Sequence, residues 1–403
     1  TYRLMLGLTT SVLLLSLVLY FFLTFQYSRP PPSFPTDGYF GEGNVYKDDE
    51  EVYPYTLSFD DNQIARLQHE YGTLLPQLDL GSVEAKVSEY LKSFDWNIHK
   101  HFLNSLEHFR TEVEGVQYHF VHSCPRNKKD AEVFPLLILP SSFSSFWNYF
   151  KLISILSNPQ RYGFDFGSSG SLSFCVVVPS YPGTTLSPSA HKDIALVDIS
   201  RQQDKLMHRL GYSSYIVYGD GGIGSEISTI MSSLFPSHIS SLIVRSPPLY
   251  LTGYRYKLQE YILATDIIST KNEQLPVFDG SLSSYFLYHL RSWSSSPLQH
   301  STLAELAIST ALFSLTDSFP SHINLIKSSS PISFQEATIH VPSYVISPQN
   351  DSVHFPLSLL RHKFMNIAKY DILDEEGGTV FALRYSPLLA KLIFSFVEIN
   401  LAA

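Results

Sequence analysis

Short apolar runs alternate with amphipathic segments over most of the chain. The apolar runs are rich in Val and Ile and end at turn residues, a pattern typical of β-strands buried on both faces. We expect such strands at residues 134–140, 172–180, 215–220 and 240–246. Apolar residues recur with helical spacing at residues 60–75, 146–159, 225–235 and 386–399. The alternation predicts an α/β domain in which a mostly parallel sheet carries helices on both faces.

Two further stretches extend this sheet. Apolar and polar residues alternate on both sides of Gly115 within residues 113–123, which predicts a β-hairpin. Residues 341–351 form another apolar strand that ends at Asp351. Because sheets of this kind place their chemistry beyond the carboxyl ends of the strands, polar residues that follow a strand are the candidate site residues.

Composition narrows the classes of function. The chain has 403 residues, of which 16% are charged, below the roughly 25% of an average soluble protein. The net charge is −9 and there is no Lys/Arg-rich run, which argues against nucleic acid as a partner. Cys124 and Cys175 lack metal-ligand spacing, so we expect two buried free thiols, with a disulfide as the less favoured alternative. We expect no metal site and no cofactor.

Residues 4–25 are uncharged and apolar. At 1.5 Å per residue a helix of this length spans about 33 Å, enough to cross a hydrocarbon core of roughly 30 Å. A cleaved signal peptide is the alternative, but no small-residue cleavage site follows. We therefore expect a single-pass anchor, and we expect residues upstream of Thr1 because the sequence does not begin with methionine. Arg3 and Arg29 flank the segment evenly, so its orientation stays open.

The stretch YGDGGIGSE at residues 218–226 lies between a predicted strand and a predicted helix. A strand, a sharp glycine-rich turn and a helix are the context of a nucleophile elbow. Residues 219–224 also match the dinucleotide fingerprint G-x-G-x-x-G. That match comes late in the chain and lacks a clear acidic strand end about 20 residues on, so we favour the elbow.

Three longer motifs resemble the microsomal and juvenile-hormone-type epoxide hydrolases. They are FDWNIHKHFLNSLEHFRTEVEGVQYHFVHS at 94–123, VVPSYPGTTLS at 177–187 and LMHRLGYSSYIVYGDGGIGSEIST at 206–229. The resemblance extends over roughly residues 55–403. It implies an α/β-hydrolase fold with a helical cap, and the predicted membrane anchor suits a microsomal protein of the endoplasmic reticulum.

This resemblance also implies a division of the chain. Residues 1–25 are the anchor, 26–54 a Pro-rich and acidic linker, and 55–125 the epoxide-hydrolase N-terminal region. Residues 126–403 form the α/β-hydrolase domain, with the cap inserted at about 247–335. In the family, an Asp attacks the epoxide carbon to form an ester, and a His oriented by a second carboxylate activates water to hydrolyse that ester. Two cap tyrosines stabilise the epoxide oxygen as it opens.

The chemical positions of this sequence depart from the family pattern. Alignment on the elbow places Gly222 at the nucleophile position, and glycine has no side chain to attack with. The family base falls at Thr379, in EEGGTVFAL, and the family acid falls at Ser358, in HFPLSLL. All three residues differ from the Asp, His and Glu that the resemblance calls for.

The motifs around the site are altered as well. The family's oxyanion-side motif H-G-W-P-G-S-F corresponds to PSSFSSF at 140–146, with Pro140 in the place of His and Phe143 in the place of Pro. The first cap tyrosine corresponds to Tyr285, in a poorly aligned stretch, and the second falls at Ile326.

A relocated active site is the alternative. Asp220 lies two residues before the apex, and Asp351 and His354 follow another strand. Placing Asp220 at the apex would put the bulky Tyr218 where the turn needs a small residue, so the simpler interpretation of Asp220 is a cap for backbone N–H groups of the turn. His354 is then a solvated loop histidine.

We therefore expect a membrane-anchored epoxide hydrolase family protein that has lost its catalysis and binds an apolar small molecule or a protein. The alternative is an active epoxide or ester hydrolase that uses Asp220 with Asp351 and His354. A third interpretation is that gene-model errors have altered the motifs, although the preserved flanks speak against scattered errors. The ligand, the membrane side and the oligomeric state stay open.

Overall fold

The computed structural model describes residues 12–20, 48–74, 84–126, 131–164, 171–190, 194–249, 285–286, 300–327, 337–348, 351 and 355–400. Nine strands form one sheet in the order β1-β2-β3-β5-β4-β6-β7-β8-β9. The strands are β1 Tyr53–Tyr55, β2 His108–Val113, β3 Val116–Ser123, β4 Ala131–Leu139, β5 Ser171–Pro179, β6 Tyr215–Gly219, β7 Ile239–Arg245, β8 Ser343–Pro348 and β9 Ile367–Leu373.

The sheet combines an antiparallel edge with a parallel centre. Strands β1, β2, β3 and β5 pair antiparallel. From β5 through β4, β6, β7 and β8 to β9 every pairing is parallel. The predicted parallel sheet and the predicted hairpin at Gly115, where β2 pairs with β3, are both confirmed.

Apolar residues leave the central strands toward both faces, because successive side chains of a strand point in opposite directions. On β4, Leu136 and Ile138 belong to one hydrophobic core, whereas Leu137 and Leu139 belong to a second. Helices α5 (Phe150–Ser157), α14 (Phe381–Arg384) and α15 (Ser386–Asn400) cover the first face, together with the short 3₁₀-helix Phe146–Tyr149. A second 3₁₀-helix, Pro159–Tyr162, follows α5. Helices α6 (Leu196–Arg209), α7 (Ile223–Leu234) and α13 (Leu357–Leu360) contribute to the second face.

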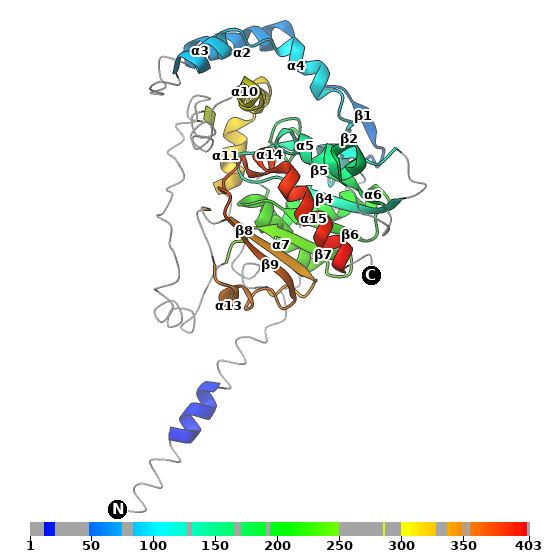
Figure 1. Cartoon of the computed structure of the whole chain (residues 1–403), viewed down its shortest axis with the longest axis vertical. Helices are drawn as coiled ribbons and strands as arrows, with labels where there is room; N and C mark the ends of the chain where they lie inside the picture. Colours follow the sequence, from blue (N-terminus) through cyan, green and yellow to red (C-terminus); the bar gives the residue numbers. More distant parts are fainter. Residues whose placement is uncertain are drawn as a thin grey trace, which may run out of the picture.

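An N-terminal arm of three helices extends from the sheet edge. It consists of α2 (Asp61–Leu74), α3 (Glu84–Lys92) and α4 (Trp96–Leu103), and Figure 1 shows it arching over α10 (His300–Leu315). The side-chain amide of Gln63 donates to the carbonyl of Leu315 at 3.1 Å, and the Tyr71 hydroxyl donates to the carbonyl of Ala307. The arm thus packs on α10, which with α11 (Phe319–Lys327) lies in the range predicted for the cap.

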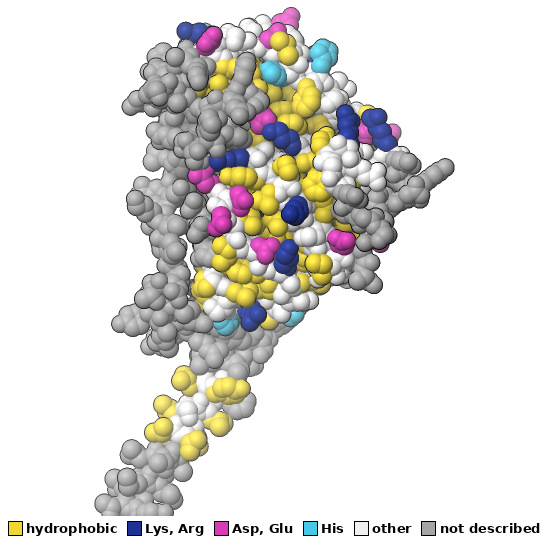
Figure 2. All heavy atoms as spheres, in the orientation of Figure 1, with side chains coloured by type: hydrophobic (Ala, Val, Ile, Leu, Met, Phe, Trp, Pro, Cys, Tyr) yellow, Lys and Arg dark blue, Asp and Glu magenta, His cyan; other side chains and the backbone are white. Residues whose placement is uncertain are grey.

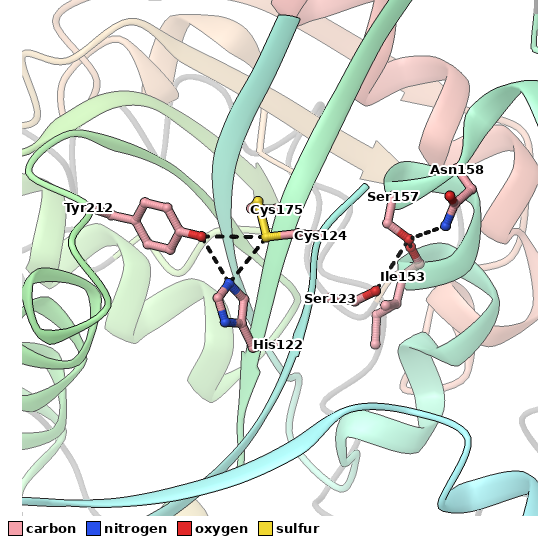
Figure 3. The surroundings of a disulfide bond; sticks show 8 residues. All are labelled: His122, Ser123, Cys124, Ile153, Ser157, Asn158, Cys175 and Tyr212. Atoms are coloured by element: carbon pink, nitrogen blue, oxygen red, sulfur yellow. Dashed lines mark hydrogen bonds between the residues drawn. A yellow bond between two sulfur atoms is a disulfide. The ribbon is translucent and has the colours of Figure 1, made fainter. Parts of the chain in front are cut away.

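Cys124 and Cys175 form a disulfide, so the prediction of two free thiols was wrong. Strands β3 and β5 pair antiparallel with Ser123 opposite Val176, and this register places Cys124 opposite Cys175. Figure 3 shows His122 and Tyr212 pointing toward Cys124. The imidazole of His122 and the hydroxyl of Tyr212 lie 2.9 Å apart, and both are within 3.6 Å of the Cys124 sulfur. The two cysteines are 51 residues apart in the sequence, and this spacing alone does not indicate that their strands are neighbours in the sheet.

The folded part of the chain begins before the predicted linker ends at residue 54. Strand β1 starts at Tyr53, and the Asp48 carboxylate accepts from the backbone N–H groups of Glu114 and Gly115 at 2.7 and 2.9 Å. Asp48 therefore holds the β2–β3 turn, in which Glu114 adopts a φ of 53°. The rest of the linker from residue 26 lies outside the described residues.

Most of the predicted anchor at residues 4–25 also lies outside the described residues. Residues 12–20 are helical, and Figure 2 shows apolar side chains around this helix. In the part of the chain that the structure describes, no helix is long and apolar enough to cross a membrane.

Candidate active site

The turn between β6 and α7 has the shape of a nucleophile elbow. Strand β6 ends at Gly219, α7 begins at Ile223, and Gly222 between them has φ 62° and ψ −127°. This backbone conformation is strained for residues with a side chain and accessible to glycine. The turn thus presents Gly222 at its apex, the position that the sequence assigned to the family nucleophile.

The hydroxyl of Ser142 lies where a side chain at the apex would begin. A Cβ built on Gly222 would come within 2.1 Å of the Ser142 Oγ. That oxygen accepts a hydrogen bond from the backbone N–H of Ile223 at 3.1 Å. Ser142 is contributed by the loop after β4, so this loop closes over the apex.

This contact involves the backbone donors of an oxyanion hole. In α/β-hydrolases the hole is formed by the N–H after the nucleophile together with an N–H from a neighbouring loop. Here the first is the N–H of Ile223, which donates to Ser142 Oγ. Among the loop's amides, that of Ser142 donates to the carbonyl of Gly221 at 3.4 Å, and that of Phe143 donates to His322 Nε2 at 3.0 Å. These donors are engaged by the protein itself.

Asp220 lies beneath the elbow and is fully buried. Its carboxylate accepts from the hydroxyls of Tyr149 at 2.6 Å and Tyr218 at 2.8 Å, and it forms an ion pair with Arg245. Burial, followed by the charge of Asp220, raises the pKa of both tyrosines, which keeps them protonated as donors. The expectation that Asp220 caps backbone N–H groups of the turn was wrong, because its carboxylate is bonded to a set of side chains instead.

Arg245 connects the loops that carry the candidate residues. It ends β7, and its guanidinium donates to Asp351 Oδ2 at 2.6 Å and to the carbonyl of Gly378 at 3.1 Å. Burial alone would lower the pKa of Arg245, but the charges of Asp220 and Asp351 raise it well above the usual value. We refer to Asp220, Arg245 and Asp351 as the buried ion triad. It forms where the carboxyl ends of β6, β7 and β8 meet.

The residues at the predicted acid and base positions differ in burial. Thr379 is buried and follows Gly378, whose N–H donates to Asp351 Oδ1 at 2.8 Å. Ser358 is exposed on α13. The carboxylate beside the Thr379 loop is therefore that of Asp351. His354, the candidate base of the alternative mechanism, lies outside the described residues.

An aromatic cluster adjoins the elbow on the cap side. It consists of Phe143, Tyr285, Phe313 and Phe319, with Ile323 and Ile326 packed against it. Tyr285 is fully buried, and its hydroxyl donates to the carbonyl of Phe143 at 2.8 Å. Ile326, at the second cap-tyrosine position, contributes an apolar side chain to the same cluster.

Sequence reasoning missed Ser142, Tyr149 and Arg245. Ser142 belongs to the aligned loop at 140–146, where the sequence indicates only an altered motif. Arg245 is the one charged residue in the apolar run SSLIVRS, which is a signal that could have found it. A charge at the end of a buried strand requires a partner of opposite charge.

Comparisons with known proteins agree with this geometry. Residues 52–149 match the family model described as "Epoxide hydrolase N terminus". The chain is 24% identical to juvenile hormone epoxide hydrolase 1 of Ctenocephalides felis over 94% of this chain and 92% of that protein. It is 26% identical to epoxide hydrolase 1 of Oryctolagus cuniculus over 95% of this chain and 96% of that protein.

Solved structures show the same fold. The juvenile hormone epoxide hydrolase of Bombyx mori superimposes with a TM-score of 0.71 at 20% identity, over 88% of this chain and 95% of that chain. The Aspergillus niger epoxide hydrolase superimposes with a TM-score of 0.65 at 23% identity, over 87% of this chain and 97% of that chain. The N-terminal region thus matches the epoxide hydrolase family model, and the chain is similar to epoxide hydrolases along nearly its whole length. Its fold is the α/β-hydrolase fold of the solved epoxide hydrolases.

Proposed function

We propose that this protein binds an apolar small molecule beside the elbow and does not form the ester intermediate of epoxide hydrolysis. The observation that carries the proposal is the contact between Ser142 and the elbow. The Ser142 hydroxyl occupies the space of an apex side chain and accepts the hydrogen bond of the Ile223 amide. Ser142 thus occupies the place of the nucleophile and also accepts the hydrogen bond of a donor that would stabilise an oxyanion.

The chemistry explains why this arrangement does not support turnover. Ester formation requires a carboxylate at the apex, and ester hydrolysis requires a base that activates water. In a serine protease, loss of the nucleophile or the base alone costs on the order of 10⁶ in rate. Here the corresponding positions hold Gly222 and Thr379, with Ser358 in place of the acid.

A relocated nucleophile is supported less well. Asp220 is the nearest carboxylate in sequence to the apex, but three side chains donate to it and none of its surface is exposed. An attacking carboxylate oxygen needs an accessible lone pair and room for the substrate carbon. Freeing Asp220 would also leave Arg245 with fewer partners in a buried site, which is costly.

The aromatic cluster supports an apolar ligand. Phe143 directly follows Ser142 and clusters with three other buried aromatic residues and two isoleucines. A relative is named for juvenile hormone epoxide, so a lipophilic epoxide or a lipid-like molecule is the class of ligand that we propose. We further propose that residues 4–25 anchor the protein at the endoplasmic reticulum membrane.

The test uses the purified full-length chain and a lipophilic epoxide such as styrene oxide in ¹⁸O-labelled water. We expect saturable binding, measured by quenching of tryptophan fluorescence, and no diol above the uncatalysed rate. The F319A variant should weaken binding, whereas I399A, at an exposed position near the end of α15, should not. A diol product with ¹⁸O entering the peptide that contains Asp220 in a single turnover would overturn the proposed inactivity.

A further inference from the structure

Two sets of side chains among the described residues bring three potential metal ligands together, and neither lies at the elbow. One set is His122 with the two disulfide-bonded cysteines, whose sulfurs are occupied with each other. The second is Asp204, His208 and His238, which can bind an ion without the reduction of a disulfide. We refer to it as the α6–β7 cluster.

The α6–β7 cluster is assembled by elements of the folded core. Asp204 and His208 are four residues apart on α6, and positions i and i+4 lie on the same face of a helix. His238 directly precedes β7, and its backbone carbonyl accepts from the N–H of Tyr215 at 2.9 Å, at the start of β6. The cluster therefore lies at the amino-terminal ends of β6 and β7, while the elbow lies at the carboxyl end of β6.

The distances fit a tetrahedral ion. Zinc–nitrogen and zinc–oxygen bonds of about 2.0–2.1 Å place two ligand atoms of a tetrahedral site roughly 3.4 Å apart. Asp204 Oδ2 lies 3.7 Å from His208 Nδ1 and 3.2 Å from His238 Nδ1. The ligand atoms of all three residues lie within 4.8 Å of one another. Small rotations of the side chains suffice to bring them onto one ion.

A buried tyrosine holds the carboxylate in place. The hydroxyl of Tyr215 donates to Asp204 Oδ1 at 2.5 Å, and this oxygen also lies 3.0 Å from His238 Nδ1. The other oxygen, Oδ2, lies near both imidazoles. Hydrogen bonds of this kind orient the ligands of metal sites. His238 stacks on Phe235 with the ring planes 6° apart, so its ring direction is fixed as well.

The two imidazoles remain accessible to an ion. The side chains of His208 and His238 are 39% and 34% exposed, whereas that of Asp204 is 8% exposed. A buried carboxylate with two half-exposed imidazoles gives three protein ligands and leaves the solvent side for water. His208 Nδ1 also lies 3.0 Å from the carbonyl of Asp204, so an ion at this nitrogen replaces a proton and its hydrogen bond.

We propose that Asp204, His208 and His238 bind one Zn²⁺ ion. Two nitrogen ligands and one oxygen ligand suit Zn²⁺, whereas Mg²⁺ prefers oxygen ligands and octahedral geometry. The ion would tie the C-terminal turns of α6 to the loop before β7. This role does not depend on the proposed function at the elbow, from which the length of β6 separates it.

The experiment is isothermal titration of Zn²⁺ into the chelator-treated full-length protein without reductant, so that the disulfide stays closed. We expect one Zn²⁺ per chain, a rise in melting temperature on binding, and no response to Mg²⁺. H208Q and H238A should each weaken Zn²⁺ binding at least tenfold, and Y215F about tenfold through the orientation of Asp204. H101A, which removes an exposed histidine on α4, should bind as the wild type does.

Circular dichroism of each variant without metal shows whether the fold is retained, and H208Q and Y215F keep the assay informative if H238A does not fold. Absence of saturable 1:1 binding in the wild type would overturn the proposal. So would Zn²⁺ binding that persists unchanged in H208Q and H238A, because the ion would then occupy another site.

Discussion

Replacing Arg245 with methionine tests whether the buried ion triad holds the loops around the elbow together. Met is unbranched and apolar, so the variant removes the guanidinium while retaining much of the side chain's length. The carboxylates of Asp220 and Asp351 would then both lose the guanidinium with which they pair, and both are buried. We expect R245M to destabilise the fold strongly.

The magnitude follows from the burial of the partners. Removing one partner of a buried ion pair costs about 3–5 kcal/mol, since an uncompensated charge stays behind. Arg245 is 2% exposed, and it pairs with two acids and the Gly378 carbonyl. We therefore expect the free energy of unfolding to fall by at least about 3 kcal/mol. Arg66 pairs with Asp317 at the surface, so R66M should cost only about 0–1 kcal/mol.

The assay is urea unfolding followed by circular dichroism for the wild type, R245M, D220N and the double variant. The Asn side chain in D220N carries no charge, and its single carbonyl oxygen takes the place of only one of the two oxygens to which Tyr149 and Tyr218 donate. If Asp220 and Arg245 interact as the structure shows, the loss in the double variant is smaller than the sum of the single losses. Additivity within about 0.5 kcal/mol would refute the reasoning, because additive effects indicate independent sites.

Two further predictions concern the apex and a buried histidine pair. Gly222→Ala should cost about 1–3 kcal/mol in backbone strain, measured by urea unfolding, and restore no epoxide turnover. Burial lowers the pKa of His108 to about 4, and that of its hydrogen-bonded neighbour His119 well below its usual value. Protonation of these two histidines therefore favours the unfolded chain. The free energy of unfolding that they contribute is fully present above about pH 6.5 and should fall as the pH is lowered toward 4. His108 alone contributes a loss of about 2 kcal/mol between pH 7.5 and pH 5.

Each of these predictions has a matched control. In an S142A background, Gly222→Ala should cost less, because the new Cβ no longer displaces a bonded hydroxyl. An equal cost in both backgrounds would contradict the proposed contact. For the histidines, H108Q should flatten the dependence of unfolding free energy on pH between 7.5 and 5, whereas H101A should not. If H108Q leaves the pH dependence of the unfolding free energy unchanged, that dependence arises from other groups.

The sequence was sufficient for the features that local patterning records. The apolar runs predicted strands β4 to β8, and the glycine-rich stretch after residue 218 predicted the elbow between β6 and α7. The motifs at 94–123 and 206–229 indicated the family through their residue order alone. Each of these features depends on neighbours along one segment of chain, where strand and helix periods repeat within a few residues.

Tertiary structure decided which distant side chains meet. Arg245 is 25 residues from Asp220 and 106 residues from Asp351, and the cysteines are 51 residues apart. Strand order and register place these groups together, and neither is encoded in local hydrophobic periodicity. For the same reason the sequence pattern of Asp220 indicates a turn cap, although its carboxylate is an ion-pair partner. Likewise, the role of Ser142 is visible only where its loop meets the apex glycine.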